Sequence, residues 1–134
     1  MSKKKYSVLI VEDEADIVDV ISTKLNAEGF QVFSTPRAPR AIQLLNNQKF
    51  SCILLDMSLE QGSGEDVISS IRKDKTSFNF QTPVLVISAN LNPNLIMRIG
   101  KDIHGALVKP FERDALVAKV KSLCPASAAG ADQG

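Results

Sequence analysis

Four apolar segments of this sequence run directly into side chains that can bind metal ions or anions. Glu12 and Asp13 follow the first segment, Asp56 ends the second, Ser88 belongs to the third, and Lys109 follows the last. Clustered carboxylates repel each other unless a cation lies among them, and a small set of oxygen ligands suits Mg²⁺. A lysine and a hydroxyl supply positive charge and a hydrogen bond for an anion. A carboxylate nucleophile with magnesium and lysine can accept a phosphoryl group.

The apolar segments are typical of strands that are buried on both faces of a parallel sheet. They cover residues 7–11, 52–56, 83–89 and 105–108, and a shorter alternating segment covers residues 30–33. The carboxyl ends of parallel strands open at one edge of the sheet, where ligands bind. We therefore expect the polar residues at the segment ends to converge, although they are far apart in the sequence.

Amphipathic segments with helical spacing separate the predicted strands. The first ends at Gly29, and the second begins near Pro36 and Pro39. The third follows a loop at residues 57–64 and is expected to turn Val67, Ile68 and Ile71 inward. The fourth begins after an Asn92 N-cap and continues through Ile99, and the fifth covers residues 112–123. Residues 73–82 are mostly polar and are predicted to form a surface loop. Strands and helices in strict alternation favour an α/β fold with a doubly wound parallel sheet.

Length and composition predict one domain at residues 6–123, with residues 124–134 as a flexible tail or the start of a linker. The chain has 134 residues, 44% of them hydrophobic, which suffices for one core. Its 16 basic and 15 acidic residues give a net charge of +1, so nucleic acid and anionic membranes are not expected partners. No apolar run is long enough to cross a bilayer, and the reduced pair Cys52 and Cys124 fits the cytoplasm.

The chain resembles the receiver domains of two-component response regulators, the CheY-like superfamily, over about residues 6–123. The resemblance rests on the motifs at residues 11–14, 54–56, 64, 88–89 and 109–111. It implies a flavodoxin-like (βα)5 fold, a three-layer sandwich whose five-stranded parallel sheet has the order 2-1-3-4-5. It also implies a Lys109-Pro110 peptide bond in the cis form.

The resemblance also implies roles at the matching positions. Asp56 matches the phosphorylated aspartate, and Asp13 matches a direct ligand of Mg²⁺. Glu12 matches a carboxylate that holds the metal through water, and the backbone carbonyl of Ser58 would complete the metal shell. Ser88 matches the hydroxyl that moves onto the phosphoryl group, and Lys109 matches the lysine that pairs with it. The implied partner is a sensor histidine kinase or a phosphotransfer protein, which would donate the phosphoryl group.

Three features depart from the usual receiver pattern. Glu60 stands where receivers usually have proline, and Ala106 stands where they usually have tyrosine or phenylalanine. Without that ring, the conformational switch that this aromatic residue provides in other receivers is not expected to work in the same way. Residues 102–105 lack the usual glycine-alanine-acidic pattern. His104, in that stretch, is predicted to lie at the surface, at the edge of the sheet opposite the acids, and not to carry phosphate.

Two other functional classes compete with a phosphorylated receiver. A receiver-like docking module that works without phosphorylation is motivated by Ala106. An enzyme that turns over outside substrates is disfavoured, because aspartate phosphatases carry a second acid where this chain has Ser58. We expect the chain to catalyse only its own phosphorylation and slow dephosphorylation. Its output is expected through its own surface or through a segment beyond Gly134.

Overall fold

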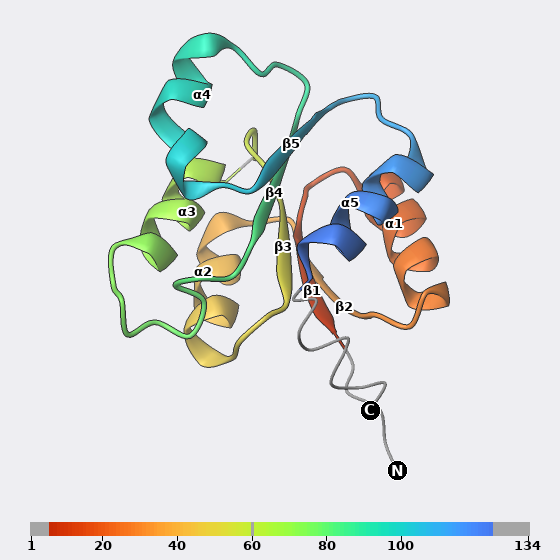
Figure 1. Ribbon diagram of the computed structural model, residues 1–134, viewed down its shortest axis with the longest axis horizontal. Helices are drawn as coiled ribbons and strands as arrows, with labels where there is room; N and C mark the ends of the chain where they lie inside the picture. Colours follow the sequence, from red (N-terminus) through yellow and green to blue (C-terminus); the bar gives the residue numbers. More distant parts are fainter. Residues whose placement is uncertain (1–5, 60, 125–134) are drawn as a thin grey trace.

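The computed structural model describes residues 6–59 and 61–124, in which strands and helices alternate (Figure 1). The strands are β1 (Ser7–Val11), β2 (Gln31–Thr35), β3 (Cys52–Asp56), β4 (Val84–Ser88) and β5 (Gly105–Val108). The helices are α1 (Ala15–Ala27), α2 (Ala38–Asn47), α3 (Gly64–Arg72), α4 (Pro93–Ile99) and α5 (Arg113–Leu123), with a 3-10 turn η1 (Gly100–Asp102) after α4. Glu60 and all of the predicted tail beyond residue 124 lie outside the described residues.

The five strands form one parallel sheet in the order β2-β1-β3-β4-β5, which confirms the predicted order. β2 extends further than the predicted residues 30–33, because β1 pairs with it along its whole length, up to Val11 opposite Thr35. Asp56 pairs with Ile87, so the carboxyl ends of β3 and β4 lie almost level. The residues that follow the strands therefore share one edge of the sheet.

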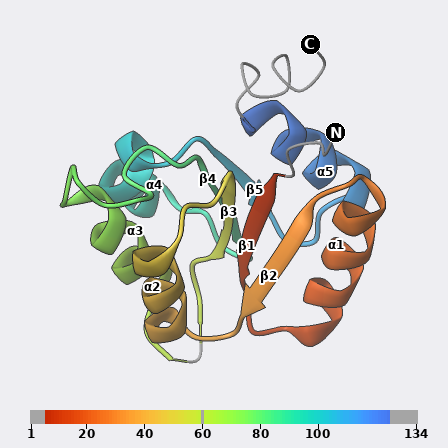
Figure 2. The ribbon, with the colours of Figure 1, turned by 90° about the horizontal axis from the view of Figure 1, so that it is seen from below.

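Helices cover both faces of this sheet and complete a three-layer sandwich (Figure 2). Side chains of β3 alternate between the faces. Cys52 and Leu54 pack in the core that includes α1 and α5, whereas Ile53 and Leu55 pack in the core that includes α2, α3 and α4. All four side chains are buried. Burial on both faces is why this strand is continuously apolar in sequence.

Two predicted helix ends are confirmed. Gly29 follows α1 with φ of +96°, a left-handed conformation that glycine adopts without a steric penalty. Asn92 caps α4, because its side-chain oxygen accepts a hydrogen bond of 2.8 Å from the backbone N–H of Leu95. The local signals for these two helix boundaries were therefore sufficient.

Gly64 lets α3 begin directly beside the end of β3. A Cβ atom at this position would lie 2.6 Å from the sulfur of Met57 and 2.9 Å from the carbonyl oxygen of Asp56. Such distances are too short for any side chain without displacement of the backbone. The glycine therefore permits the close approach of a helix to the strand that carries the central acid.

The prediction of a surface loop at residues 73–82 is wrong for two of its polar residues. Asn79 is completely buried and Thr82 is 2% exposed. The Asn79 side chain accepts a hydrogen bond from Phe50 N–H at 2.8 Å and donates to the carbonyls of Leu45 and Gln48 at 2.8 and 2.9 Å. Thr82 donates to the carbonyl of Phe50 at 3.1 Å or to the Asn79 side chain at 2.9 Å. These bonds satisfy buried backbone groups between α2 and β3, which explains why polar residues are inside.

His104 lies where it was predicted, exposed and just before β5, at the edge of the sheet opposite the acids. Its Nδ1 atom accepts a hydrogen bond of 3.3 Å from the backbone N–H of Val84. Partial burial and the nearby Arg72 guanidinium lower the pKa of His104. The imidazole thus supports the start of β4 through this contact.

No helix among the described residues has both the length and the hydrophobicity to cross a membrane.

Candidate functional site

Three carboxylates meet at the carboxyl edge of the sheet. Glu12 and Asp13 come from the turn after β1, and Asp56 is the last residue of β3; one oxygen of each lies within 4.8 Å of the others. Glu12 is 1% exposed and Asp56 is 2% exposed. A cavity of about 350 Å³ opens over them, and its lining includes Asp13, Asp56 and Ser58. The predicted convergence of these acids is confirmed.

Lys109, which follows β5, brings its ammonium group into the same cluster. Its Nζ atom lies 3.0 Å from Oε1 of Glu12, 3.1 Å from Oδ2 of Asp56 and 2.6 Å from Oε2 of Glu14. Burial lowers the pKa of Lys109, but the hydrogen bonds to Glu14, Glu12 and Asp56 outweigh this and raise it above its usual value. The lysine is therefore a fixed positive charge. The Lys109-Pro110 bond next to it is cis, as the resemblance implied.

Glu14 is a member of the cluster that sequence reasoning missed. It follows the two predicted acids in the chain, and it is 59% exposed at its side chain, yet it makes the shortest contact to Lys109. The run of three acids after β1 was the available signal. Sequence alone does not say which of three successive side chains in a turn can reach a residue 95 positions away.

Ser58 and Ser88 are placed differently. Ser58 lines the acidic cavity, and its backbone N–H donates a 2.9 Å hydrogen bond to Oδ1 of Asp56. Ser88 ends the neighbouring strand and is buried, but its hydroxyl exchanges hydrogen bonds with the backbone of Asn90, at 3.1 and 3.3 Å. Ala89, rather than Ser88, contributes to the lining of the cavity. The predicted residues Glu12, Asp13, Asp56, Ser58 and Lys109 thus lie together. The Ser88 hydroxyl instead bonds to the backbone of the turn that follows β4.

The donor set fits a hard divalent cation. Oε1 of Glu12 is buried and accepts no hydrogen bond, although the Lys109 ammonium group is 3.0 Å away. Buried oxygens without a donor are unusual, and a metal ion or its water satisfies them. The carboxylate oxygens of Glu12, Asp13 and Asp56 are hard ligands of the kind that Mg²⁺ prefers, and the cavity beside them has room for water. The residues present therefore fit the predicted metal.

Burial raises the pKa of Glu12 to about 7, because removal from water disfavours the charged carboxylate; the hydrogen bond to Lys109 opposes this effect and the neighbouring Asp56 adds to it. A group with a raised pKa binds protons more tightly in the folded chain than in the unfolded chain, whose reference value is 4.5. The raised pKa of Glu12 therefore stabilises the folded chain at pH values below the reference pKa. This stabilisation is lost as pH rises through the pKa of the folded chain.

We expect the free energy of unfolding, in Mg²⁺-free buffer, to fall as pH rises from about 5 to about 7, by on the order of 1 to 3 kcal/mol. Glu12→Gln should remove most of this slope, because the amide does not titrate. Urea denaturation at a series of pH values, with a chelator present, measures the effect. Glu65→Gln is the matched control: its carboxylate pairs with Arg98 at 3.0 Å on the surface, so the native slope should persist. If the free energy of unfolding of the native chain does not change between these pH values, the raised pKa of Glu12 is contradicted.

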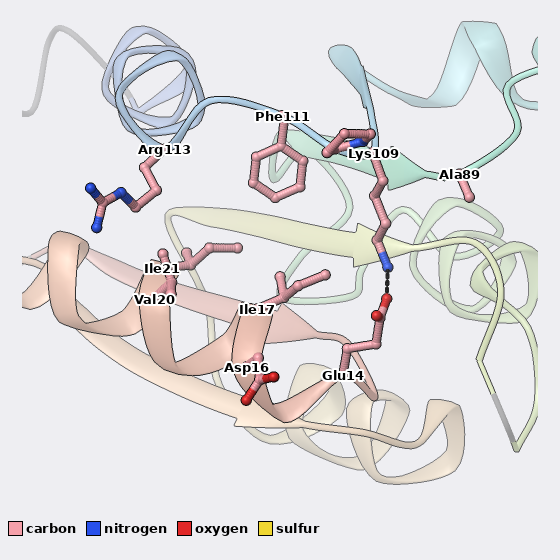
Figure 3. Close-up of a pocket in the computed structure, with 10 residues that line it drawn as sticks. Glu14, Asp16, Ile17, Val20, Ile21, Ala89, Lys109, Phe111 and Arg113 are labelled. Carbon is pink, nitrogen blue, oxygen red and sulfur yellow. Dashed lines mark hydrogen bonds and ion pairs between the residues drawn. The ribbon is translucent and has the colours of Figure 1, made fainter.

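A second, larger cavity of about 560 Å³ lies beside the acidic one, between α1 and the segment that joins β5 to α5 (Figure 3). Its walls are mainly apolar and include Ile17, Val20 and Phe111. Glu14 and Lys109 line both cavities. The ion pair between them therefore lies where the two cavities adjoin.

The sequence model of the family described as response regulator receiver domain matches residues 8–121. Among curated proteins, the chain is 29% identical over 117 residues to the cell cycle response regulator CtrA of Brucella ovis; the match covers 87% of this chain and 49% of the relative. The chain thus spans about half the length of the curated relatives it matches.

Solved structures agree with this family. The signal receiver domain of a putative Luxo repressor protein from Vibrio parahaemolyticus has a TM-score of 0.80 at 26% identity, and the match covers 90% of both chains. The receiver domain of a sensor histidine kinase from Pseudomonas aeruginosa, solved with magnesium coordinated in its active site cleft, has a TM-score of 0.78 at 22% identity. That match covers 90% of this chain and 98% of the other, and it shows the shared fold. With the family model matched along most of the sequence and the strand order in place, the chain belongs to the response regulator receiver domains of two-component systems.

Proposed function

We propose that Asp56 accepts a phosphoryl group from the phosphohistidine of a sensor histidine kinase or phosphotransfer protein, in a reaction that depends on Mg²⁺ and takes place in the cytoplasm. The observation that carries this proposal is the position of the Asp56 carboxylate. It ends a buried strand, opens into the acidic cavity, and lies 3.1 Å from the Lys109 ammonium group. No other carboxylate among the described residues combines these features.

The transfer is a displacement at phosphorus. A carboxylate oxygen of Asp56 forms the new bond to phosphorus, the N–P bond of the donor breaks, and the imidazole nitrogen leaves with the electron pair. Oδ1 of Asp56 is held by the Ser58 N–H and Oδ2 by Lys109, so the nucleophile is fixed in position before the donor arrives. Mg²⁺, held by Glu12, Asp13, Asp56 and the Ser58 carbonyl, would neutralise charge on the transferring group.

After transfer, Lys109 pairs with the phosphoryl oxygens and Ser88 donates its hydroxyl to them. Ser88 must first give up its bonds to Asn90, which is a local change in the turn after β4. The new charge of about −2 on residue 56 supplies the driving force for that change. The surface then differs between the two states, and slow hydrolysis of the aspartyl phosphate restores the first.

A docking module that works without phosphorylation is the second candidate. Two observations favour it: the Ser88 hydroxyl is bonded within its own turn, and Ala106 replaces the usual aromatic residue on β5. In that case the acidic site would serve only the fold. The complete set of acids with Lys109 favours phosphorylation instead.

The proposal is tested by measuring the intact mass of the chain after incubation with acetyl phosphate. This donor transfers its phosphoryl group to Asp56, and acetate leaves with the electrons of the broken P–O bond. With Mg²⁺ we expect one phosphoryl adduct per chain, and with excess chelator we expect the yield to fall at least about tenfold. The adduct should be lost at alkaline pH, as an acyl phosphate is. An unmodified chain under conditions that label another receiver would favour the docking module.

A further inference from the structure

Glu14 holds Lys109 more closely than either of the two buried acids does. Its contact with Nζ is 2.6 Å, against 3.0 Å for Glu12 and 3.1 Å for Asp56. Glu14 is also different in exposure: its side chain is 59% exposed, whereas those of Glu12 and Asp56 are 0% and 3% exposed. The ion pair thus joins a solvent-facing carboxylate to a lysine that is 13% exposed.

The helix that begins after Glu14 does not explain this position. Glu14 is the N-cap residue of α1, but its side chain makes no capping hydrogen bond. Figure 3 shows the side chain directed away from the helix and toward Lys109. Its contact is therefore made to the functional site and not to its own element.

An ammonium group has three N–H donors, and three carboxylates already surround that of Lys109. A phosphoryl group on Asp56 carries more charge and more acceptor oxygens than the Asp56 carboxylate it replaces, so it competes with one of the other two carboxylates for a second donor of Lys109. For Glu12 the loss would leave a buried charge without its partner, which costs far more than the loss of an exposed pair. Glu14 can return to water, so it is the partner that is exchanged.

We propose that Glu14 is a positioning residue that holds Lys109 in the unphosphorylated state and opposes the approach of an anionic phosphodonor. When Glu14 dissociates from Lys109, one N–H group of the lysine becomes available to hydrogen-bond the phosphoryl group. This inference rests on the proposed phosphorylation of Asp56 and adds a residue that controls its rate.

The test compares the initial rate of labelling by acetyl phosphate with Mg²⁺ in the native chain and in Glu14→Gln. Removal of one negative charge within a few ångströms of a doubly charged donor should raise the second-order rate constant about three- to tenfold at low salt, mainly through a lower half-saturating donor concentration. The gain should shrink in about 0.5 M salt, where screening is strong.

Two matched variants separate position from charge. Asp16→Asn removes an exposed carboxylate from the first turn of α1 that lines the apolar cavity, but no ion pair joins Asp16 to Lys109 in the described chain. Its rate should stay within about twofold of native, since an exposed charge further away is screened. Glu14→Asp keeps the charge and should restore most of the native rate.

The NMR signal of the Lys109 side chain is a readout that does not need phosphorylation. It should move in Glu14→Gln and stay in place in Asp16→Asn. If the native chain is labelled but Glu14→Gln is not faster, or if Asp16→Asn is accelerated equally, the inference is wrong while the proposed function stands. If the native chain takes no label at all, both are overturned.

Discussion

Asp56→Asn is expected to reduce phosphoryl incorporation to background, at least about a hundredfold below the native chain, because an amide is not a nucleophile toward phosphorus. The substitution keeps nearly the same shape. Asparagine can still accept the hydrogen bond from Ser58 N–H, which in the native chain is 2.9 Å from Oδ1. The loss would therefore belong to the chemistry and not to a displaced strand.

Intact mass with acetyl phosphate and Mg²⁺ measures this prediction, and digestion of the labelled native chain locates the modified residue. Asp19→Asn is the control, since it removes an exposed carboxylate of α1 that lines neither cavity, and it should label as the native chain does. The folded state should survive in Asp56→Asn, because three clustered acids repel one another and the variant removes one charge. Full labelling of Asp56→Asn, or a label found on another residue, would show that Asp56 is not the residue that accepts the phosphoryl group.

Asn79→Ala is expected to lower the free energy of unfolding by about 2 to 4 kcal/mol, because it leaves several buried backbone groups without partners. The side chain is fully buried and joins Phe50, Leu45 and Gln48 by hydrogen bonds of 2.8 to 2.9 Å. Alanine restores none of these bonds and leaves a gap where the amide stood. Urea denaturation at neutral pH measures the change.

Asn46→Ala is the matched control, because Asn46 is exposed on α2 and alanine is the better helix former. That variant should be as stable as the native chain or slightly more stable. Asn79 lies near the amino ends of the strands, away from the acidic site, so Asn79→Ala that is still folded should label at the native rate. A loss below about 1 kcal/mol would show that water replaces the amide at this position.

β3 folds as its sequence predicts. Its apolar run predicted a strand buried on both faces, and the structure places Ile53 and Leu55 in one core and Cys52 and Leu54 in the other. Parallel topology then required the residues at the strand ends to meet. The meeting of Glu12, Asp13, Asp56 and Lys109 at one edge of the sheet follows from those two facts.

In the loop at residues 73–82, polar composition is a poor guide to exposure. Polar composition predicts exposure, because most polar side chains stay in water. Asn79 and Thr82 are exceptions because backbone groups near Phe50, about thirty positions earlier, need hydrogen-bond partners. That need arises only when the chain has folded, so no local pattern reports it.

The fold class and the acids at the carboxyl edge of the sheet follow from the amino-acid sequence, because the pattern of apolar and polar residues along each segment specifies the strands, the helices and their ends. The strand order follows from the family resemblance. Which side chains pair at that edge depends on the folded domain. There, Glu14 is the closest partner of Lys109, and the Ser88 hydroxyl is bonded to Asn90. These pairings depend on distances of a few tenths of an ångström between residues far apart in sequence, and such distances are set by the packing of the whole domain.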